Sequence, residues 1–258
     1  MNCKICHAEN KEIFVAKILK KYDVHYFACS KCGFICTEDP YWLEEAYISP
    51  INTADTGILA RNIFFSNLMI NIIYYLFNYK GKFLDYAGGY GIFTRLMRDY
   101  GFDFKWQDKF AKNFLARGFE YSENDSDLDM VTAFEVLEHL IDPIKEFEEI
   151  FKISSNVLFS TELIPDNTPN PSDWWYYGLN HGQHVSFYSK KTLEFIANKY
   201  GLNYYSHGDS LHLFTVKKIN PIVFKILINN KSGLLFRLWA KKNLKSKTWD
   251  DYLLMDKK

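Results

Sequence analysis

Four of the five cysteines stand in two close pairs near the amino terminus. Cys3 and Cys6 form the first pair and Cys29 and Cys32 the second, with 22 residues between the pairs. Each Cys-x-x-Cys is typical of a tight knuckle that directs two thiolates inward, so two knuckles predict a closed, structural zinc site without room for a reactive water. Two weaker alternatives are a pair of disulfides, which the lack of a secretion signal disfavours, and His7 as a replacement ligand.

Histidines in two later stretches are candidates for acid–base chemistry. Histidine titrates near neutral pH, so it can take the proton of a hydroxyl nucleophile within hydrogen-bond reach. His181 and His139 are therefore our candidate general bases, and Glu138 could orient His139 or bind substrate. The competing interpretations are a solvated loop residue for His181 and packing beside the cofactor for His139.

His184 has a different predicted role. It precedes an alternating apolar run and the Ser189 helix cap, so we expect it to anchor its loop by hydrogen bonds next to the substrate. A weaker alternative is a divalent metal ion held by His181 and His184 together with Glu162 or Asp173.

A glycine turn follows the apolar run that ends at Asp85. Ala87, Gly88, Gly89 and Gly91 bring little or no side chain, so the backbone here can approach a nucleotide-like ligand closely. A dinucleotide fold would need a further glycine where Thr94 stands. The turn therefore does not fit the dinucleotide pattern.

An acid followed by small-x-Gly-x-Gly resembles the first motif of the class I S-adenosylmethionine-dependent methyltransferases, with Ala87 where that family usually has glycine. The acid Asp108, at the end of the next predicted strand, fits the family's ribose-binding position. Residues 128–143 look like the family's fourth strand and the loop and helix after it, which contain Phe134 and Glu135. The resemblance implies that S-adenosylmethionine contacts Asp85, Ala87, Gly88, Gly89, Gly91, Asp108, Phe134 and Glu135.

The implied fold is α/β, a Rossmann-like class I methyltransferase with a seven-stranded sheet and an antiparallel edge hairpin. Apolar runs predict strands near residues 82–86, 102–107, 118–121, 129–134, 156–161, 202–206 and 211–217, with helices between them. We expect a zinc ribbon at 1–40, a helical connection or lid at 41–80, the cofactor-binding domain at 81–217 and a helical cap at 218–258.

A long aromatic loop leaves the predicted fifth strand. Such a loop is uncommon unless it is functional, and it starts at the sheet edge where doubly wound folds bind ligands. We expect at least one ring of the loop to line the acceptor pocket, although the tryptophans could instead be core. The candidate substrate residues are Trp174, Trp175, Tyr176, Tyr177 and His184.

The run His184-Val-Ser-Phe-Tyr-Ser resembles a loop of small methyltransferases of sugar, capsule and lipopolysaccharide biosynthesis. This resemblance implies O-methylation of a carbohydrate, a sugar phosphate or a phosphoramidate precursor of a surface polysaccharide, with a histidine base. The runner-up is a nucleotide-sugar C-methyltransferase, whose relatives carry a larger carboxy-terminal domain. A zinc-ribbon protein that binds nucleic acid and an inactive cofactor-binding scaffold are alternatives from other classes.

Composition narrows the classes of partner. The 258 residues contain 31 basic and 31 acidic side chains, a balance that argues against a protein built mainly to neutralise nucleic-acid phosphates. The absence of a secretory signal or a transmembrane segment leads us to expect a cytoplasmic protein with a small-molecule acceptor. The segment 219–245 mixes apolar and basic residues, and we favour a helical cap over a membrane surface there.

Overall fold

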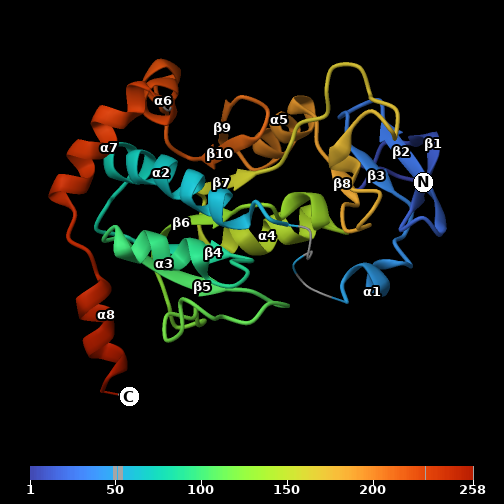
Figure 1. Ribbon diagram of the computed structural model, residues 1–258. Coiled ribbons are helices and arrows are strands. Elements are labelled where there is room, and N and C mark those ends of the chain that lie inside the picture. The colour runs from blue at the N-terminus through green and yellow to red at the C-terminus, as the bar shows by residue number, and fades with distance from the viewer. Residues whose placement is uncertain (49–50, 52–54, 230, 258) are drawn as a thin grey trace. The chain divides into compact units, whose positions relative to one another are not determined.

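The computed structural model describes residues 1–48, 51, 55–229 and 231–257 (Figure 1). The predicted connection over 41–80 therefore includes residues 49–50 and 52–54, which lie outside the described part. The chain forms two compact units, and each is built from two stretches of sequence. The first unit comprises Met1–Asn52 and Phe134–Val216, and the second comprises Thr53–Ala133 and Lys217–Lys258.

A mixed sheet of six strands has the order β5-β4-β6-β7-β10-β9. Its strands are β4 (Lys82–Tyr86), β5 (Asp103–Gln107), β6 (Leu128–Ala133), β7 (Val157–Ser160), β9 (Asn203–His207) and β10 (Leu211–Thr215). Strand β4 pairs in parallel with β5 and β6, whereas β10 pairs antiparallel with β7 and β9. The predicted α/β fold and antiparallel edge hairpin are confirmed.

Of the seven predicted strands, the one at 118–121 is wrong. In the described chain, this stretch makes only an isolated bridge between Glu120 and Trp106. Gly118 has φ +87°, a left-handed conformation that interrupts an extended backbone directly before the bridge. The stretch is therefore too short and too bent to form a full strand.

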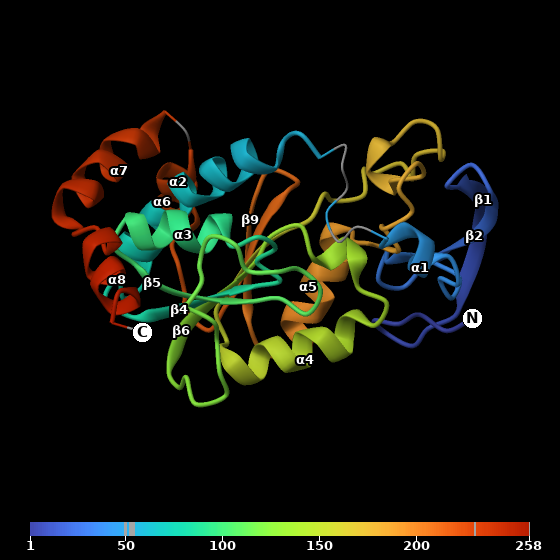
Figure 2. The same cartoon turned by 60° about the horizontal axis from the view of Figure 1, so that its bottom comes forward.

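Helices of the second unit pack on one another beside its three parallel strands (Figure 2). They are α2 (Ile58–Leu76), α3 (Ile92–Asp99), α6 (Pro221–Ile228), α7 (Ser232–Asn243) and α8 (Thr248–Met255). Asn71 on α2 is buried and its amide donates to the carbonyls of Leu227 (2.6 Å) and Gly233 (2.9 Å), which end α6 and begin α7. The carboxy-terminal segment is thus helical, as predicted, and tied to α2 by buried hydrogen bonds.

A buried ion pair attaches α8 to the rest of the second unit. Arg98 at the end of α3 donates from Nε and Nη2 to the two carboxylate oxygens of Asp251, at 2.8 and 2.7 Å. Its Nη1 donates to Asp103 at 2.7 Å, and the guanidinium lies 3.6 Å from the ring centre of Phe119. Because both oxygens of Asp251 bind the same guanidinium fork, this charge pair fixes the orientation of α8 as well as its distance.

The first unit contains a second, four-stranded sheet with the order β1-β2-β3-β8. Its strands are β1 (Asn10–Ile18), β2 (Tyr22–Cys29), β3 (Ile35–Thr37) and β8 (Ser186–Phe187). The unit's helices are α1 (Leu43–Ala46), η1 (Leu137–His139), α4 (Pro143–Ile153), η2 (Trp175–Tyr177) and α5 (Lys190–Lys199). The short strand β8 belongs to the aromatic loop, so the loop extends the amino-terminal sheet, which the sequence did not reveal.

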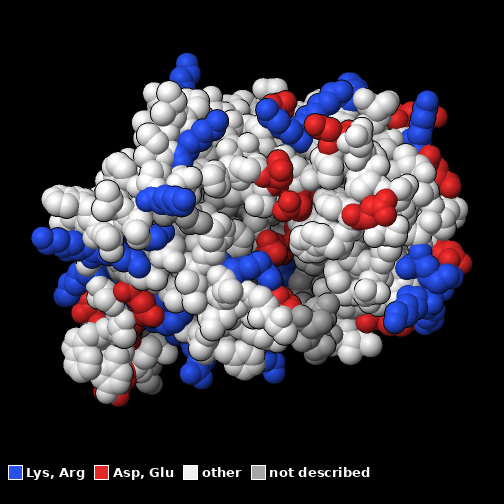
Figure 3. Space-filling view, turned by 45° about the horizontal axis from the view of Figure 1, so that its top comes forward, with Lys and Arg blue, Asp and Glu red and all other residues white. Residues whose placement is uncertain are grey.

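Charged side chains are mixed on the face drawn in Figure 3, where Lys and Arg do not merge into one continuous basic patch. No described helix is both long enough and apolar enough to cross a membrane.

Replacing Asp251 by Asn is expected to lower the free energy of unfolding by about 2 kcal/mol, because the buried guanidinium of Arg98 then keeps only one of its two charge partners, Asp103. The matched control is Asp250→Asn, whose side chain is 56% exposed and which should cost less than about 1 kcal/mol. Urea unfolding of both variants tests the prediction. Equal losses in the two variants would show that the buried pair does not hold α8.

Candidate functional site

The glycine turn of the second unit lies between β4 and α3. Gly89 and Gly91 have φ of +53° and +81°, a left-handed conformation that glycine adopts without steric cost. A Cβ on Gly91 would lie 2.8 Å from Oδ1 of Asn113 and 3.0 Å from the amide nitrogen of Ala116. The turn thus requires glycine at this position both for its backbone angle and for its close packing.

Ala87 also has a positive φ, +55°, although it is not glycine. A left-handed conformation costs an L-residue about 1 to 2 kcal/mol. This cost is a physical reason why glycine suits this position better than alanine.

Asp85 is buried beneath the turn. Its Oδ2 accepts a hydrogen bond from Thr94 Oγ1 at 2.8 Å, and a Cβ on Gly88 would lie 2.6 Å from the same oxygen. Burial raises the pKa of Asp85 to about 7, even though hydrogen bonds from Thr94 and Thr132 oppose this rise. The carboxyl group therefore supports the turn from below.

Asp108 follows β5 and holds the other side of the turn. Its Oδ2 accepts from the amide of Gly89 at 2.9 Å, while Oδ1 accepts from the amides of Phe110 and Ala111, both at 2.7 Å. A carboxylate has about four acceptor directions, so these three bonds leave capacity for a ribose hydroxyl. Asp85, Asp108 and the small residues of the turn are thus brought together in one unit, as the sequence predicted for a cofactor site.

Phe134 and Glu135, the other two predicted cofactor contacts, belong to the first unit. Glu135 has φ +56°, and Ser160 Oγ bridges its backbone and side chain. The amide of Glu135 donates to that hydroxyl at 2.7 Å, and the hydroxyl donates to Oε1 of Glu135 at 2.7 Å. Left-handed non-glycine residues persist only where their surroundings hold them, and they concentrate at functional sites.

The four cysteines Cys3, Cys6, Cys29 and Cys32 converge in the first unit. Their sulfur atoms all lie within 4.8 Å of one another, and the Cys3–Cys32 and Cys6–Cys29 separations are 3.5 and 3.4 Å. The contact between Cys3 and Cys32 lowers the pKa of Cys3 and raises that of Cys32, so these two thiols share one hydrogen. In a tetrahedral zinc site with Zn–S bonds of about 2.3 Å, the sulfur atoms lie about as far apart as the four sulfur atoms do here. This donor set therefore fits a structural zinc ion.

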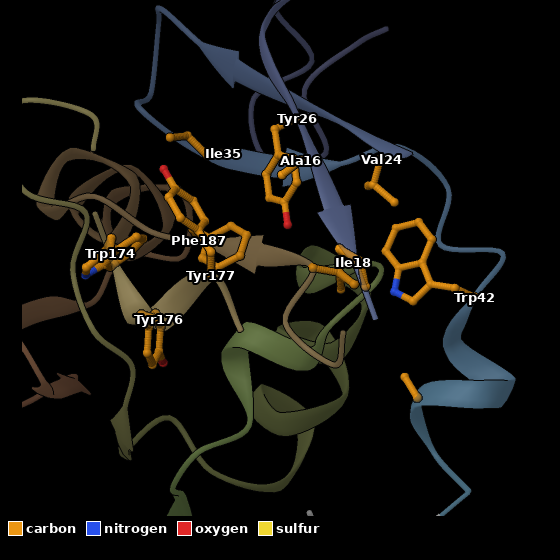
Figure 4. Close-up of a cluster of buried hydrophobic side chains, with 12 residues drawn as sticks. Ala16, Ile18, Val24, Tyr26, Ile35, Trp42, Trp174, Tyr176, Tyr177 and Phe187 are labelled. Carbon is orange, nitrogen blue, oxygen red and sulfur yellow. The ribbon is translucent and has the colours of Figure 1, made fainter. Parts of the chain in front are cut away.

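Three of the four aromatic candidates in the loop are core residues. Trp174, Tyr176 and Tyr177 are buried in one cluster with Tyr26 and Phe187, and several of their rings meet edge to face (Figure 4). Trp175 differs, with 77% of its surface exposed. The core interpretation thus accounts for three of these rings, and only Trp175 is available to stack on a ligand face.

Glu138, His139, His181 and His184 gather in the first unit. The ring centres of His139 and His184 are 4.9 Å apart, and those of His181 and His184 are 4.7 Å apart. Glu138 and His184 are buried, whereas His139 and His181 are partly exposed. The sequence candidates for catalysis therefore lie around His184, for which the sequence analysis gave an anchoring role beside the substrate and, as a weaker alternative, a metal-binding role.

Backbone carbonyls lie next to Nδ1 of two of these imidazoles. Nδ1 of His184 lies 2.6 Å from the carbonyl of Tyr176, and Nδ1 of His139 lies 3.1 Å from the carbonyl of Gln183. A carbonyl can only accept, so Nδ1 of His184 carries the hydrogen and its Nε2 keeps the lone pair. Nδ1 of His139 also lies 2.8 Å from the Tyr47 hydroxyl, so it carries the hydrogen in the tautomer that donates to Gln183 and is bare in the tautomer that accepts from Tyr47. His181 has the opposite tautomer to His184 when neutral, with the hydrogen on Nε2, because its Nδ1 accepts from the backbone amide of Gln183 at 3.2 Å.

Burial lowers the pKa of all three histidines. The pKa of His139 falls to about 4, that of His184 falls well below its usual value, and that of His181 is lowered as well. The like charges that neighbouring imidazoles would carry add to this effect for His139 and His184. At neutral pH, the cluster is therefore a set of uncharged imidazoles beside the carboxyl group of Glu138.

Hydrogen bonds from the loop hold η1 in place. The amide of Val185 donates to the carbonyl of Glu138 at 2.8 Å, and the hydroxyl of Tyr188 donates to that of Leu137 at 2.9 Å. Tyr47 completes the cluster, since its hydroxyl lies 2.8 Å from Nδ1 of His139. Tyr47 is a site residue that sequence reasoning missed, because 92 residues separate it from its partner and no motif surrounds it.

Comparison with known proteins gives one family match. A family model described as a methyltransferase domain matches residues 62–207, which is more than half of the chain. A search of curated proteins found no match.

Similar solved structures include TnmH and the mitomycin 7-O-methyltransferase MmcR, each 15% identical, with TM-scores of 0.46 and 0.45. The similar regions cover 69% and 67% of this chain, and 62% and 59% of those chains. An O-methyltransferase family protein from Burkholderia thailandensis is 12% identical, with a TM-score of 0.43 and coverage of 68% and 64%. The chain thus spans about three fifths of the length of the first two, and this degree of similarity identifies neither an acceptor nor a reaction.

Proposed function

Because the chain belongs to the methyltransferase domain family, we propose that it transfers a methyl group from S-adenosylmethionine to an oxygen of a small acceptor. The acceptor class that we propose is a carbohydrate, a sugar phosphate or a phosphoramidate precursor of a surface polysaccharide. The observation that carries the proposal is the turn itself, in which Gly91 has a left-handed backbone and Asp85 and Asp108 hold the turn from two sides.

The reaction needs one proton acceptor besides the methyl donor. The hydroxyl oxygen of the acceptor bonds to the methyl carbon as the carbon–sulfur bond breaks, and that electron pair stays on sulfur to give S-adenosylhomocysteine. The hydroxyl proton passes to a histidine of the cluster formed by His139, His181 and His184, which is uncharged at neutral pH. These imidazoles supply the base of the proposal.

The acceptor class is supported by the resemblance of the loop at 184–189 to loops of sugar-modifying methyltransferases. Trp175 adds a physical argument, because an exposed indole offers a flat apolar face on which a sugar ring can stack. The other aromatic residues of the loop are committed to packing in the first unit.

One structural zinc ion, held by Cys3, Cys6, Cys29 and Cys32, completes the proposal. The donor set is all sulfur and closed, so the ion would stabilise the fold and would not bind the acceptor.

The proposal is tested by calorimetric titration of the protein with S-adenosylhomocysteine, with NAD as the comparison ligand. Gly91→Val should weaken S-adenosylhomocysteine binding by about tenfold or more, since a branched side chain adds strain and fills the turn. Gly201→Ala is the control, because it also has a positive φ but lies in open space away from the turn. Unchanged affinity in the Gly91 variant, or binding of NAD alone, would refute the cofactor assignment.

The base is tested by His181→Gln in a methyl-transfer assay with labelled S-adenosylmethionine and a panel of nucleotide-linked sugars. Loss of a general base is expected to lower kcat by about 10²-fold or more while S-adenosylhomocysteine affinity stays the same. His207→Gln at the end of β9 is the matched control and should keep its kcat. A fully active His181 variant would remove this residue from the proposal.

The zinc site is tested by Cys29→Ser with metal analysis by mass spectrometry. We expect the zinc content to fall from one ion per chain towards none and the melting temperature to drop, because binding at such sites contributes to folding. Cys36→Ser, in the same sheet but outside the four-cysteine set, should keep the zinc. One ion per chain in the Cys29 variant would mean that the ligand set is wrong.

A further inference from the structure

The histidine cluster has the composition and geometry of a second metal site. Glu138, His139 and His184 each offer one donor atom, and these donor atoms all lie within 4.8 Å of one another. Two imidazole nitrogens with one carboxylate form a set that binds first-row transition metals and leaves coordination positions open. From this convergence, we propose that Glu138, His139 and His184 bind one divalent transition-metal ion, separate from the ion of the cysteine site.

The hydrogen bonds of both histidines can leave Nε2 for such an ion. The carbonyl of Tyr176 holds the Nδ1–H group of His184, which leaves the lone pair on Nε2 of that ring. The carbonyl of Gln183 holds Nδ1 of His139 in the same way in the tautomer whose Nε2 is free to bind an ion. Metal-binding histidines usually donate their second ring N–H to a carbonyl or carboxylate in this way, which fixes the ring and raises its donor strength.

The backbone around the three residues is already ordered by hydrogen bonds. Glu138 and His139 are consecutive in η1, and the amide of Val185, next to His184, donates to the carbonyl of Glu138 at 2.8 Å. The chain segments that carry the three ligands are therefore joined directly. Metal bonds of about 2.1 Å would draw the donor atoms somewhat closer, which side-chain movement alone can provide.

This set differs from the metal alternative drawn from the sequence, which combined His181 and His184 with Glu162 or Asp173. In neutral His181 the hydrogen is on Nε2, because Nδ1 accepts from the amide of Gln183. Asp173 accepts hydrogen bonds from Asn170 and Ser172, which lowers the pKa of its carboxyl group within its own turn. In the set that we propose, His139 replaces His181 as the second histidine ligand, and Glu138 replaces Glu162 or Asp173 as the carboxylate ligand.

The role of the ion rests on the proposed function. Its open coordination positions suit a hydroxyl or phosphate oxygen of the acceptor, and a bound cation polarises the oxygen that it holds. Histidines that bind the ion cannot also take the acceptor's proton. In this arrangement the proton acceptor is therefore His181, the histidine outside the ligand set.

The test is a titration with Mn²⁺ of protein that carries one zinc ion per chain, followed by the loss of the free Mn²⁺ signal in electron paramagnetic resonance. We expect one Mn²⁺ per chain in addition to the zinc. Glu138→Gln and His184→Gln should each weaken Mn²⁺ binding by at least about tenfold, because each removes one ligand. His181→Gln is the matched control and should bind Mn²⁺ with its affinity changed by less than about threefold.

Two further readouts keep the test decisive. Zinc content and S-adenosylhomocysteine affinity that match the original protein show that a variant is folded, so a lost Mn²⁺ site then reflects a lost ligand. Absence of saturable Mn²⁺ binding, or Mn²⁺ affinity in Glu138→Gln and His184→Gln that is unchanged from the original protein, overturns the inference even where methyl transfer proceeds. Saturable Mn²⁺ binding without binding of S-adenosylhomocysteine would leave the metal site standing and refute the proposed function.

Discussion

The first unit depends on the hydrogen bonds that attach residues 182–188 to three other stretches of chain, around Thr37, around Trp42 and Ala46, and around Glu138. The carbonyl of Gly182 accepts from the indole N–H of Trp42 at 2.8 Å, and the side-chain amide of Gln183 donates to the carbonyl of Ala46 at 2.9 Å. Val185 binds Glu138 through its amide and Thr37 through its carbonyl, at 2.8 and 3.1 Å. Without these bonds, His184 would not meet Glu138 and His139, since only this loop brings it there.

The fold was predictable where one face or both faces of a strand are buried. The strand β4 was predicted at its observed limits, and β6 was displaced by one residue, because buried parallel strands leave continuous apolar runs in the sequence. A strand was wrongly predicted around Glu120, because a composition typical of strands does not reveal the left-handed backbone at Gly118. The two-residue strand β8 gave no signal, since two residues cannot show a period.

The candidate site was predictable where chemistry depends on neighbours in sequence. Acid and glycine spacing located the left-handed turn between β4 and α3, and the spacing within each cysteine pair predicted the convergence of the four cysteines, because each knuckle is a local structure. The histidine cluster was only partly predictable. Which ring nitrogen carries the hydrogen depends on carbonyls of Tyr176 and Gln183, and no pattern in the chain encodes that these carbonyls face the rings.

The amino-terminal sheet and the aromatic loop are connected through the second cysteine knuckle. The carbonyl of Cys32 accepts from the hydroxyl of Thr192 at 2.9 Å and from that of Ser189 at 3.3 Å, and these two residues form the capping box of α5. The loop that carries His184 ends at this cap, so an ion that stiffens the knuckle also restrains the loop.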